Sequence, residues 1–434
     1  MGTYTGPRIV TDGLILDLDI ANSKSFIDAQ NTSLINTSTW AVGNNAVTGY
    51  TLNETATNEN ARITGTDPFG KTNLVWGTFA SGDNNGDGGW NTDFYAIDRT
   101  KLYRFSVWVK RTSSSSSGNF YFGLYGSGGT WGIKRNDGGG VETNPYWDCI
   151  SPSTFTQDVW YLVTGHVYPA GTSSPVTHPD TGVYTISGGT TKVRDPNFCN
   201  IGGDVQWLTD STVTLHRTYH YYSGDNTTRL QFALPRIDLC DGNQPSLSDL
   251  LTKSPAEMYD NSGLGNHHYM RGYYVPNSSA PRKFDFTGNV HWLSRSGALA
   301  GVSTTCTVVI WYAATDIQEL WARGSGNDSV YLSASYNNGD YYHSGVGTPT
   351  NYVDLKVTTN PGSPINYHDG NYHMWEAKSV NLSGWTFFDW FGYGSYGGGW
   401  GLTGKVSRIM VYNRNLSAEE STRNYAALRG RFSI

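Results

Sequence analysis

Charged side chains are scarce in this sequence of 434 residues: only 15% are Asp, Glu, Lys or Arg, and Glu occurs just eight times. Long helices rely on Lys, Glu and similar residues, so this scarcity argues against a helical protein. The net charge of −6 comes without any run of basic residues. Sequences that bind nucleic acid or an anionic membrane usually carry such runs, so we expect neither partner.

Long apolar runs are missing as well. No segment approaches the roughly 18 apolar residues that a membrane-spanning helix needs, so we expect no membrane span. The first residues, MGTYTGPRIVTDG, lack the basic and apolar regions of a secretory signal. Gly6 stands where an N-myristoylation signal requires Ser or Thr, which argues against that modification.

The four cysteines are far apart, and no CxxC pair is present. This spacing excludes zinc ribbons and dithiol redox motifs. Two disulfides are compatible with the sequence, but buried free thiols on strands are the favoured interpretation. The residues concerned are Cys149, Cys199, Cys240 and Cys306.

What the sequence has instead is Gly, aromatic residues and small polar residues, with 52 Gly, 29 Tyr and 15 Trp. Aromatic residues favour strands, and Gly and Asn favour turns, so the sequence predicts an all-β protein. Its composition is typical of extracellular lectin-type domains, although we expect no export signal from its first residues. A virion protein, assembled inside a cell and used outside it, fits both observations; a secreted protein whose signal has been removed would also fit.

The segment 7–26 is the one around which the chain is organised. Apolar residues at positions 14, 16, 18 and 20 alternate with Asp17 and Asp19, which is the period of a half-buried strand. Such a strand needs partners in a sheet, and similar patterns return only after about residue 255. We therefore expect this strand to pair with segment 405–413, and a second β-domain to be inserted between the two.

Two further elements stand out. Segments 213–222 and 229–240 predict a hairpin, and the residues at 213, 215, 217, 219 and 221 share one face of its first arm. Ser417 and Glu420 have the spacing of a capping box. The sequence therefore predicts a C-terminal helix from Ser417 to about Leu428, ahead of Gly430.

Six motifs occur in a fixed order near the ends of the chain: GLILDLDIAN at 13–22, YDNSGLGNH at 259–267, FDFTG at 284–288, TVVIWY at 307–312, DGNYH at 369–373, and a closing strand and helix at 404–420. Together they resemble the laminin-G-like, concanavalin A-like lectin/glucanase superfamily. The resemblance implies a β-sandwich (jelly roll) whose first and last strands are neighbours, with one short C-terminal helix.

Between these motifs, IDRTKLYRFSVW at 97–108 resembles a strand of jelly-roll carbohydrate-binding domains. The whole arrangement, with GPRIVTDGL at 6–14 in front, is similar to virion or tail-fibre-like structural proteins of tailed bacteriophages, those of cyanobacterial phages in particular. We expect residues 1–28 plus 243–434 to form a concanavalin A-like sandwich. Residues 29–242 would form an inserted carbohydrate-binding-module-like jelly roll, a second β-sandwich near the N-terminus.

Catalytic motifs are not found. The glucanases of this superfamily place acid and nucleophile on one strand with an ExDxE-type pattern, which none of the eight Glu residues makes. GxSxG, HExxH and phosphate-loop motifs are also missing from the sequence. Asp17 and Asp19 share a strand face, where contacts with backbone or loop groups are favoured over catalysis. We therefore expect no catalytic residue and no enzyme.

One segment resembles a metal site. Residues 83–88, DNNGDG, match the first half of an oxygen-ligand calcium loop, but Phe94 stands where the twelfth position requires Glu. A solvated Asx/Gly turn explains the motif without a metal. The candidate Ca²⁺ ligands are Asp83, Asn85, Asp87 and Asp93, and the sequence indicates no other cofactor.

Sugars are bound by flat aromatic rings and a few amides on shallow β-surfaces. The stretch 385–400 is the densest in aromatic residues, and two more Trp lie in Gly-rich segments. The alternative is that aromatic residues fill the sandwich cores or make subunit contacts. The candidate carbohydrate-binding residues are Trp385, Trp390, Tyr393, Tyr396, Trp400, Trp90 and Trp131.

These observations lead us to expect a non-enzymatic phage structural protein, assembled in the host cytoplasm and exposed on the virion surface as a capsid decoration or a tail or fibre component. Its expected partners are other virion proteins, further copies of itself in a dimer or trimer, and host-surface polysaccharide. A stand-alone carbohydrate-binding lectin is the first alternative, and an unrecognised glycoside hydrolase built from scattered Asp residues is the second.

Overall fold

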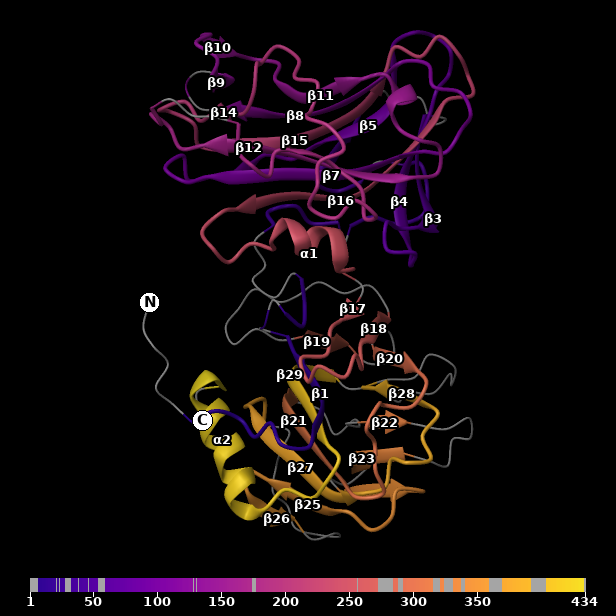
Figure 1. Ribbon diagram of the computed structural model, residues 1–434, viewed down its shortest axis with the longest axis vertical. Coiled ribbons are helices and arrows are strands. Elements are labelled where there is room, and N and C mark those ends of the chain that lie inside the picture. The colour runs from indigo at the N-terminus through magenta and orange to yellow at the C-terminus, as the bar shows by residue number, and fades with distance from the viewer. Residues whose placement is uncertain are drawn as a thin grey trace. The chain divides into compact units, whose positions relative to one another are not determined.

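In the computed structural model the chain forms two compact units, both built from β-sheets (Figure 1). The end unit combines Met1–Gln30 with Pro255–Ile434, and the inserted unit is Asn31–Ser254. The structure describes residues 7–432 except 21, 23, 28–32, 38, 46, 54–58, 128, 130, 174–176, 256, 272–283, 288–291, 315–320, 324–330, 337–339, 359–368 and 392–402. The predicted fold class is confirmed: the protein is all-β, with a second sandwich inserted near the N-terminus and a C-terminal helix.

The boundaries between the units differ from the sequence-based ones. The sequence predicts residues 243–254 in the end unit and 29–30 in the inserted unit, whereas the structure groups 243–254 with the inserted unit and 29–30 with the end unit. Segment 243–254 carries α1 (Leu247–Thr252). Leu247, Leu250 and Leu251 are buried, so its apolar side anchors the segment.

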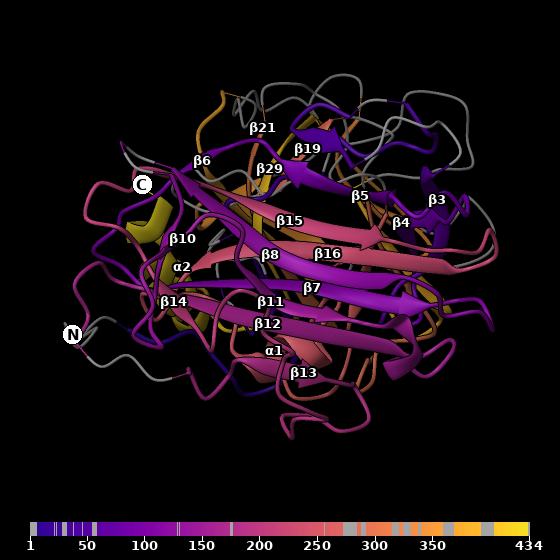
Figure 2. The same cartoon turned by 90° about the horizontal axis from the view of Figure 1, so that it is seen from above.

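The inserted unit is a sandwich of two sheets, and Figure 2 shows its long strands running side by side. The nine-stranded sheet has the order β10 (Val141–Glu142), β9 (Ile133–Arg135), β14 (Val205–Gln206), β12 (Trp160–Tyr168), β7 (Tyr103–Arg111), β16 (Arg229–Leu239), β4 (Thr72–Phe79), β3 (Asn60–Thr66), with β13 (Gly182–Tyr184) beside β12. The six-stranded sheet has the order β11 (Tyr146–Ile150), β8 (Asn119–Ser127), β15 (Val213–Tyr221), β5 (Gly86–Thr92), β2 (Tyr50–Leu52), with β6 (Tyr95–Ala96) beside β15. A short 3₁₀ turn, Pro152–Thr154, follows β11.

The predicted hairpin of β15 and β16 is wrong, because the two strands belong to different sheets. β15 pairs with β8 and β5, whereas β16 pairs with β7 and β4. The connection at 222–228 therefore crosses from one sheet to the other, and Tyr222 takes a φ of 65° at the crossing.

The end unit is also a sandwich of two sheets. The first has the order β1 (Leu14–Asp19), β29 (Thr403–Tyr412), β21 (Cys306–Ala314), β27 (His373–Val380), β25 (Thr350–Val353), β26 (Lys356–Thr358), with β19 (Phe284–Thr287) beside β29. The second has the order β17 (Glu257–Met258), β18 (His268–Arg271), β20 (Trp292–Ser296), β28 (Phe387–Trp390), β22 (Trp321–Arg323), β23 (Tyr331–Tyr336), β24 (Asp340–Ser344). α2 (Ala418–Phe432) follows β29.

The first strand pairs with the last, as the sequence predicts: β1 is antiparallel to β29, with Leu18 opposite Ile409. Leu16 and Leu18 lie in the core between the sheets. Asp17 and Asp19 face the other way, but they are not on a solvated surface. Both are buried, and Asp17 holds Arg408 through two contacts of 2.8 Å.

The helix α2 explains this burial, because it covers the outer side of the first sheet (Figure 1). Arg431 of the helix contacts Asp19 at 2.8 Å. The predicted capping box is confirmed, since Ser417 Oγ accepts from Glu420 N at 3.2 Å and Ser417 N donates to Glu420 Oε2 at 2.9 Å. The helix continues through Gly430 to Phe432, beyond its predicted end.

The motif at 259–267 fastens β1 to the loop beside it. Asp260 Oδ1 accepts from the backbone N–H groups of Asp17 and Ser262 at 2.9 Å. Asn266 Nδ2 donates to the carbonyl of Ile15 at 2.7 Å. The Asp, Ser and Asn residues of this motif thus have a structural role in the end unit. None of the helices in the described ranges has the length and apolarity to cross a membrane.

Candidate functional site

The outer side of the six-stranded sheet in the inserted unit is rich in tyrosine. Alternate residues of a strand point to opposite sides, and on β8 Phe120, Phe122 and Leu124 fill the core. Tyr121 and Tyr125 therefore lie on the outer side. The same alternation on β15 and β11 adds further residues, and we call the resulting surface the tyrosine face: Tyr121, Tyr125, Tyr146, Arg217, Tyr219 and Tyr221, with Asn91 and Asn144 beside them.

Strand register brings these residues together. Arg217 lies opposite Asn91 on one side and Gly123 on the other, and Gly123 lies opposite Tyr146. A Cβ atom at Gly123 would lie 2.7 Å from Cδ1 of Tyr146 and closer still to the carbonyl oxygen of Pro145. Only glycine at this position leaves room for the Tyr146 ring beside β8.

Arg217 is the one cation of the tyrosine face. Its Nε and Nη2 donate to the carbonyl of Leu124 at 2.9 and 2.5 Å, and its Nη1 donates to Asn144 Oδ1 at 2.8 Å. The guanidinium also lies 4.7 Å from the ring centroid of Tyr146 and 5.3 Å from that of Tyr125. These contacts fix the guanidinium between two rings, in the geometry of a cation–π interaction.

The phenols of the tyrosine face contact one another edge to face. The ring centroids of Tyr121 and Tyr146 are 5.0 Å apart with planes at 65°, and those of Tyr121 and Tyr221 are 6.2 Å apart at 82°. Tyr219 donates its hydroxyl hydrogen to Asn91 Oδ1. Burial raises the pKa of Tyr146 and of Tyr219, so both phenols stay protonated and keep their donor capacity at neutral pH.

Two exposed aromatic side chains flank the tyrosine face. Trp131 is 51% exposed and stacks on Tyr125, with centroids 5.4 Å apart and planes at 26°. Tyr222 is 50% exposed, and its ring lies 4.9 Å from that of Tyr221. Both offer ring surface to a ligand in solution, and Trp131 is a residue that the sequence singled out.

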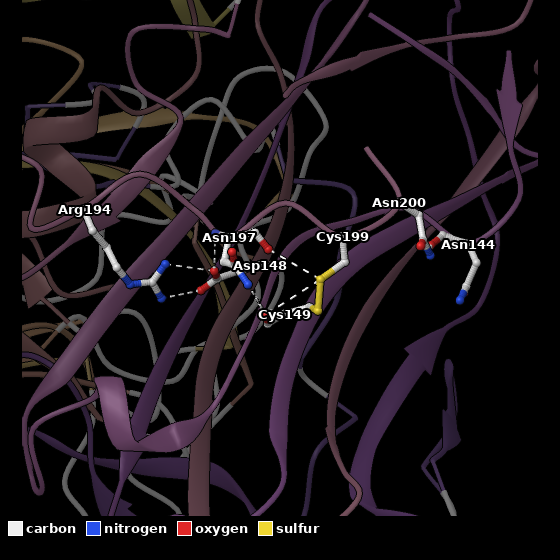
Figure 3. The surroundings of a disulfide bond; sticks show 7 residues. All are labelled: Asn144, Asp148, Cys149, Arg194, Asn197, Cys199 and Asn200. Carbon is white, nitrogen blue, oxygen red and sulfur yellow. Dashed lines mark hydrogen bonds and ion pairs between the residues drawn. A yellow bond between two sulfur atoms is a disulfide. The ribbon is translucent and has the colours of Figure 1, made fainter. Parts of the chain in front are cut away.

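A disulfide supports the edge strand of the face (Figure 3). Cys149, opposite Tyr121 in the register, is bonded to Cys199, so the expectation of free thiols is wrong for this pair. The interpretation failed because the two residues are 50 positions apart, and only the fold brings their Cα atoms to 5.9 Å. Cys240 and Cys306 are free.

The same segment carries polar contacts that reach the face (Figure 3). Arg194 holds Asp148 through two contacts of 2.9 and 2.6 Å. Asn200 Nδ2 donates to the carbonyl of Asn144 at 2.9 Å. Because Asn144 in turn accepts from Arg217, the segment 194–200 helps to position the cation.

Three predicted sugar-binding residues are buried, which corrects the sequence-based interpretation. Trp90, Trp385 and Trp390 are at most 2% exposed, so no ring surface is open to a ligand. Trp90 packs against Trp40 and Trp76 inside the inserted unit, since a ring of this area gains most by leaving water. Trp385 and Trp390 lie in the core of the end unit. Tyr393, Tyr396 and Trp400 lie outside the described residues.

Most of the tyrosine face was missed at the level of sequence. The pattern on 213–221 already placed Arg217, Tyr219 and Tyr221 on one side of a strand. This alternation of tyrosines with residues that face the core, such as His216, is the sequence signal that could have identified the site. Joining them to Tyr121 and Tyr146 requires the strand order, which the chain order does not reveal.

The predicted calcium loop is only partly realised. Asp83 and Asp87 come together with Glu59, one ligand atom of each lying within 4.8 Å of the others. Asn85 is exposed and uses its backbone N–H for Asp83 Oδ1 at 3.2 Å, and Asp93 lies outside the group. Burial raises the pKa of the Asp87 carboxyl to about 6, and Asp83 and Asp225 add to the rise.

No protein-family model and no curated protein matches the chain. Among solved structures it is similar to the CBM22-1–CBM22-2 tandem domain from Paenibacillus barcinonensis Xyn10C, at 11% identity and a TM-score of 0.24, over 97% of this chain and 96% of that chain. The binding domain of botulinum neurotoxin serotype C1 matches at 12% identity and a TM-score of 0.25, over 96% and 98% of the two chains. The binding domain of botulinum neurotoxin DC in complex with SialylT matches at 10% and 0.23, over 89% and 100%. Scores this low assign no function to the chain.

Proposed function

We propose that this protein is a non-enzymatic glycan-binding protein of a phage virion surface and that the tyrosine face of its inserted unit contacts the sugar. The observation that carries the glycan-binding proposal is the convergence of Tyr121, Tyr146, Tyr219 and Tyr221 around Arg217 on one side of a sheet. These side chains do not belong to the core between the sheets, because the other side of the same strands fills it. Tyr146 and Tyr219 are buried at 7% exposure, so the partly exposed Tyr121 and Tyr221 would offer the ring surface to the sugar.

The chemistry of the tyrosine face suits a sugar. Aromatic rings offer apolar area to the C–H side of a pyranose ring at little cost in conformational entropy. The hydroxyls of the partly exposed Tyr121 and Tyr221 and the amides of Asn91 and Asn144 offer hydrogen bonds to sugar hydroxyls. The Arg217 guanidinium is buried and its N–H groups donate to Leu124 and Asn144, so it fixes the shape of the surface and does not itself contact the sugar. Exposed Trp131 and Tyr222 extend this surface at its rim, so the face would accommodate several sugar units of a polysaccharide.

The non-enzymatic part of the proposal rests on the groups present. Glycoside hydrolysis needs two carboxyl groups placed on either side of the scissile bond. The side chains that define the tyrosine face are phenols, amides and one guanidinium, and none of them is a carboxylate. They can bind and orient a sugar, but they lack the pair of carboxyl groups that most glycoside hydrolases use as acid and nucleophile or base.

The placement on a virion rests on the sequence resemblance to tailed-phage structural proteins. The disulfide between Cys149 and Cys199 supports use in an oxidising environment, because disulfides persist on virion and cell surfaces and are rare in the cytosol. The disulfide fits the alternative of a secreted lectin equally well. The proposed partners are other virion proteins, further copies of this chain and host-surface polysaccharide.

Glycan binding is tested with an array of bacterial surface polysaccharides, followed by titration of the best ligand. We expect Trp131→Ala and Tyr222→Ala each to weaken binding about tenfold, which corresponds to about 1.4 kcal/mol. Both side chains are half exposed, so neither change should affect folding. Val357→Ala, which alters an exposed side chain of the end unit, is the matched control.

Two results would overturn these proposals separately. If no glycan binds at millimolar concentration, or if the two aromatic variants bind as the wild type does, the tyrosine face is not the sugar site. If mass spectrometry and antibody labelling of purified phage particles do not find the protein, the virion assignment fails while glycan binding stands, and the lectin alternative takes its place.

A further inference from the structure

Three carboxylates meet at one end of β5 in the inserted unit, and we call them the acidic cluster: Glu59, Asp83 and Asp87. They come from three segments, since Glu59 precedes β3, Asp83 lies in the loop between β4 and β5, and Asp87 is part of β5. Glu59 and Asp87 are fully buried, whereas Asp83 is exposed. The cluster thus has a buried floor and a side that is open to solvent.

The backbone around the acidic cluster is arranged for close approach. Gly88 has a φ of 106°, and a Cβ atom there would overlap the carbonyl of Glu59. Asn60 Oδ1 accepts from Gly89 N at 2.8 Å and from Trp76 Nε1 at 2.9 Å. These contacts bind the segment of Glu59 tightly to the strand of Asp87, so the two carboxylates cannot easily move apart.

Asp87 provides an independent sign of a ligand. Its Oδ2 accepts from Ser223 N at 2.8 Å, and the backbone N–H of Ser81 also acts on the carboxyl, but its Oδ1 makes no hydrogen bond although the side chain is fully buried. A buried carboxylate oxygen that lacks a donor is costly. The charges that act on Asp87 include those of Asp83 and Asp225, which are of the same sign. A positive ion at this site would supply both a partner for this oxygen and a charge that offsets those of the carboxylates.

We propose that the acidic cluster binds a divalent cation, and that the cation is Ca²⁺. The ligand groups are all carboxylates, which are hard oxygen donors, and neither His nor Cys belongs to the cluster. Ca²⁺ accepts irregular sets of six to eight oxygen ligands, whereas Mg²⁺ demands a near-ideal octahedron. Asp83 and Asp87 hold the first and fifth places of the loop pattern, and Glu59 supplies from another segment the acidic group that the loop lacks.

This cation site is independent of the glycan-binding proposal, but it borders the same surface. Tyr222 N donates to the carbonyl of Asn85 at 2.7 Å, and Asn84 N donates to the carbonyl of Ser223 at 3.2 Å. Ser223 N also donates to Asp87 Oδ2. These three hydrogen bonds join residues 83–87 to the connection 222–228, which includes Tyr222. A bound cation would hold this connection in place.

The test is isothermal titration of the full chain with CaCl₂ and, separately, MgCl₂ after treatment with a chelator, together with thermal unfolding in both salts. We expect one Ca²⁺ site per chain, a higher midpoint of unfolding in Ca²⁺, and weaker binding of Mg²⁺. Asp87→Asn and Glu59→Gln should each weaken Ca²⁺ binding roughly 100-fold or more, since each removes a buried charged ligand.

Asp93→Asn is the matched control, because Asp93 is a carboxylate that follows the other end of β5 and lies outside the cluster. Folding of the variants is checked by thermal unfolding in chelator. Without a cation the carboxylates repel one another, so Asp87→Asn should unfold at the same midpoint as the wild type or at a higher one. The proposal is refuted if the wild type shows neither heat nor a shifted midpoint at 10 mM CaCl₂, which is roughly tenfold above the weakest usual calcium sites. It is also refuted if folded Asp87→Asn and Glu59→Gln respond as the wild type does, and a preference for Mg²⁺ would refute the assignment to Ca²⁺.

Discussion

Two histidines that are buried in their neutral form make this fold sensitive to acid. His268 is fully buried; its Nδ1 lies 3.0 Å from the carbonyl of Asn266, and its Nε2 accepts from Trp390 Nε1 at 2.9 Å. Both ring nitrogens are used by the neutral form. Burial lowers the pKa of His268 to about 3, and it lowers the pKa of His216 in the inserted unit to about 3 as well.

We expect the stability of both units to fall between neutral pH and pH 5. Unfolded histidine binds a proton below about pH 6.5, whereas the folded residue does so only near pH 3, so the unfolded state gains protons and stability is lost as the pH falls through this window. At pH 5 each histidine accounts for about 2 kcal/mol. Urea unfolding of the wild type and of His268→Gln at pH 7 and pH 5 measures the effect. Equal slopes with pH in the two proteins would contradict it.

Gly123 is a second residue with an outsized role. Gly123→Ala should destabilise the inserted unit by about 1–3 kcal/mol, because the new methyl group has to displace the Tyr146 ring and the Pro145 carbonyl. The same change should weaken glycan binding, since the Tyr146 ring packs against the Arg217 guanidinium and helps to position it. Gly140→Ala is the matched control: a Cβ atom at Gly140 meets nothing within 4 Å. An equal effect of the two changes on unfolding would rule out the steric explanation.

At the scale of elements, α2 shows how tertiary contacts override local preference. Gly430 costs a helix about 1 kcal/mol relative to Ala, yet the helix continues through it. The reason is Phe432, whose ring stacks on those of Trp311 and Tyr372 at 4.7 and 4.8 Å. The capping box fixes the start of the helix through local hydrogen bonds. The end of the helix depends on Phe432, which stabilises the last turn only because its ring packs against the sheet.

We therefore expect opposite effects from two changes in the last turn. Phe432→Ala should destabilise the end unit by about 3 kcal/mol, because it removes a buried ring. Gly430→Ala should stabilise it by about 1 kcal/mol, since a Cβ atom there meets nothing within 4 Å. Chemical denaturation followed by Trp fluorescence reports both. If Gly430→Ala destabilises, the helix does not run through this position in solution.

The elements that the sequence predicted correctly are those whose pattern is local. The period of two in β1 fixes which side chains face the core, and the capping box marks the start of α2. The pairing of β15 with β8 and β5 depends on a crossing between sheets that no local pattern marks. The tyrosine face and the acidic cluster each draw on three or more segments, so their members are recognised only when the strand order is known.

At the scale of the whole molecule, the inserted unit has the features of an independent domain. It has its own core, and its first described segment lies beside its last long strand, since Leu34 N donates to the carbonyl of Ile237 at 2.8 Å. Entry and exit of the chain are thus close together in this unit, which is the arrangement that tolerates domain insertion.

Residues 31–254 should accordingly fold alone. We expect the excised unit to unfold cooperatively and to keep the glycan and Ca²⁺ affinities of the full chain within about twofold, because both proposed sites lie wholly within it. Circular dichroism melts and titrations of the excised unit provide the measurement. If the excised unit is unfolded under native conditions, the inserted unit depends on the end unit for its stability although it has a core of its own.

The pairing of β1 with β29 has a consequence for synthesis. Asp17 is translated 391 residues before its partner Arg408, so at 5–20 residues per second the first strand waits roughly 20 to 80 s on the ribosome for the last one. During that time the inserted unit has emerged completely, while β1 is an unpaired apolar edge. Asp17 and Asp19, which become buried ion pairs in the finished fold, interrupt its apolar run and would act until then as guards against aggregation.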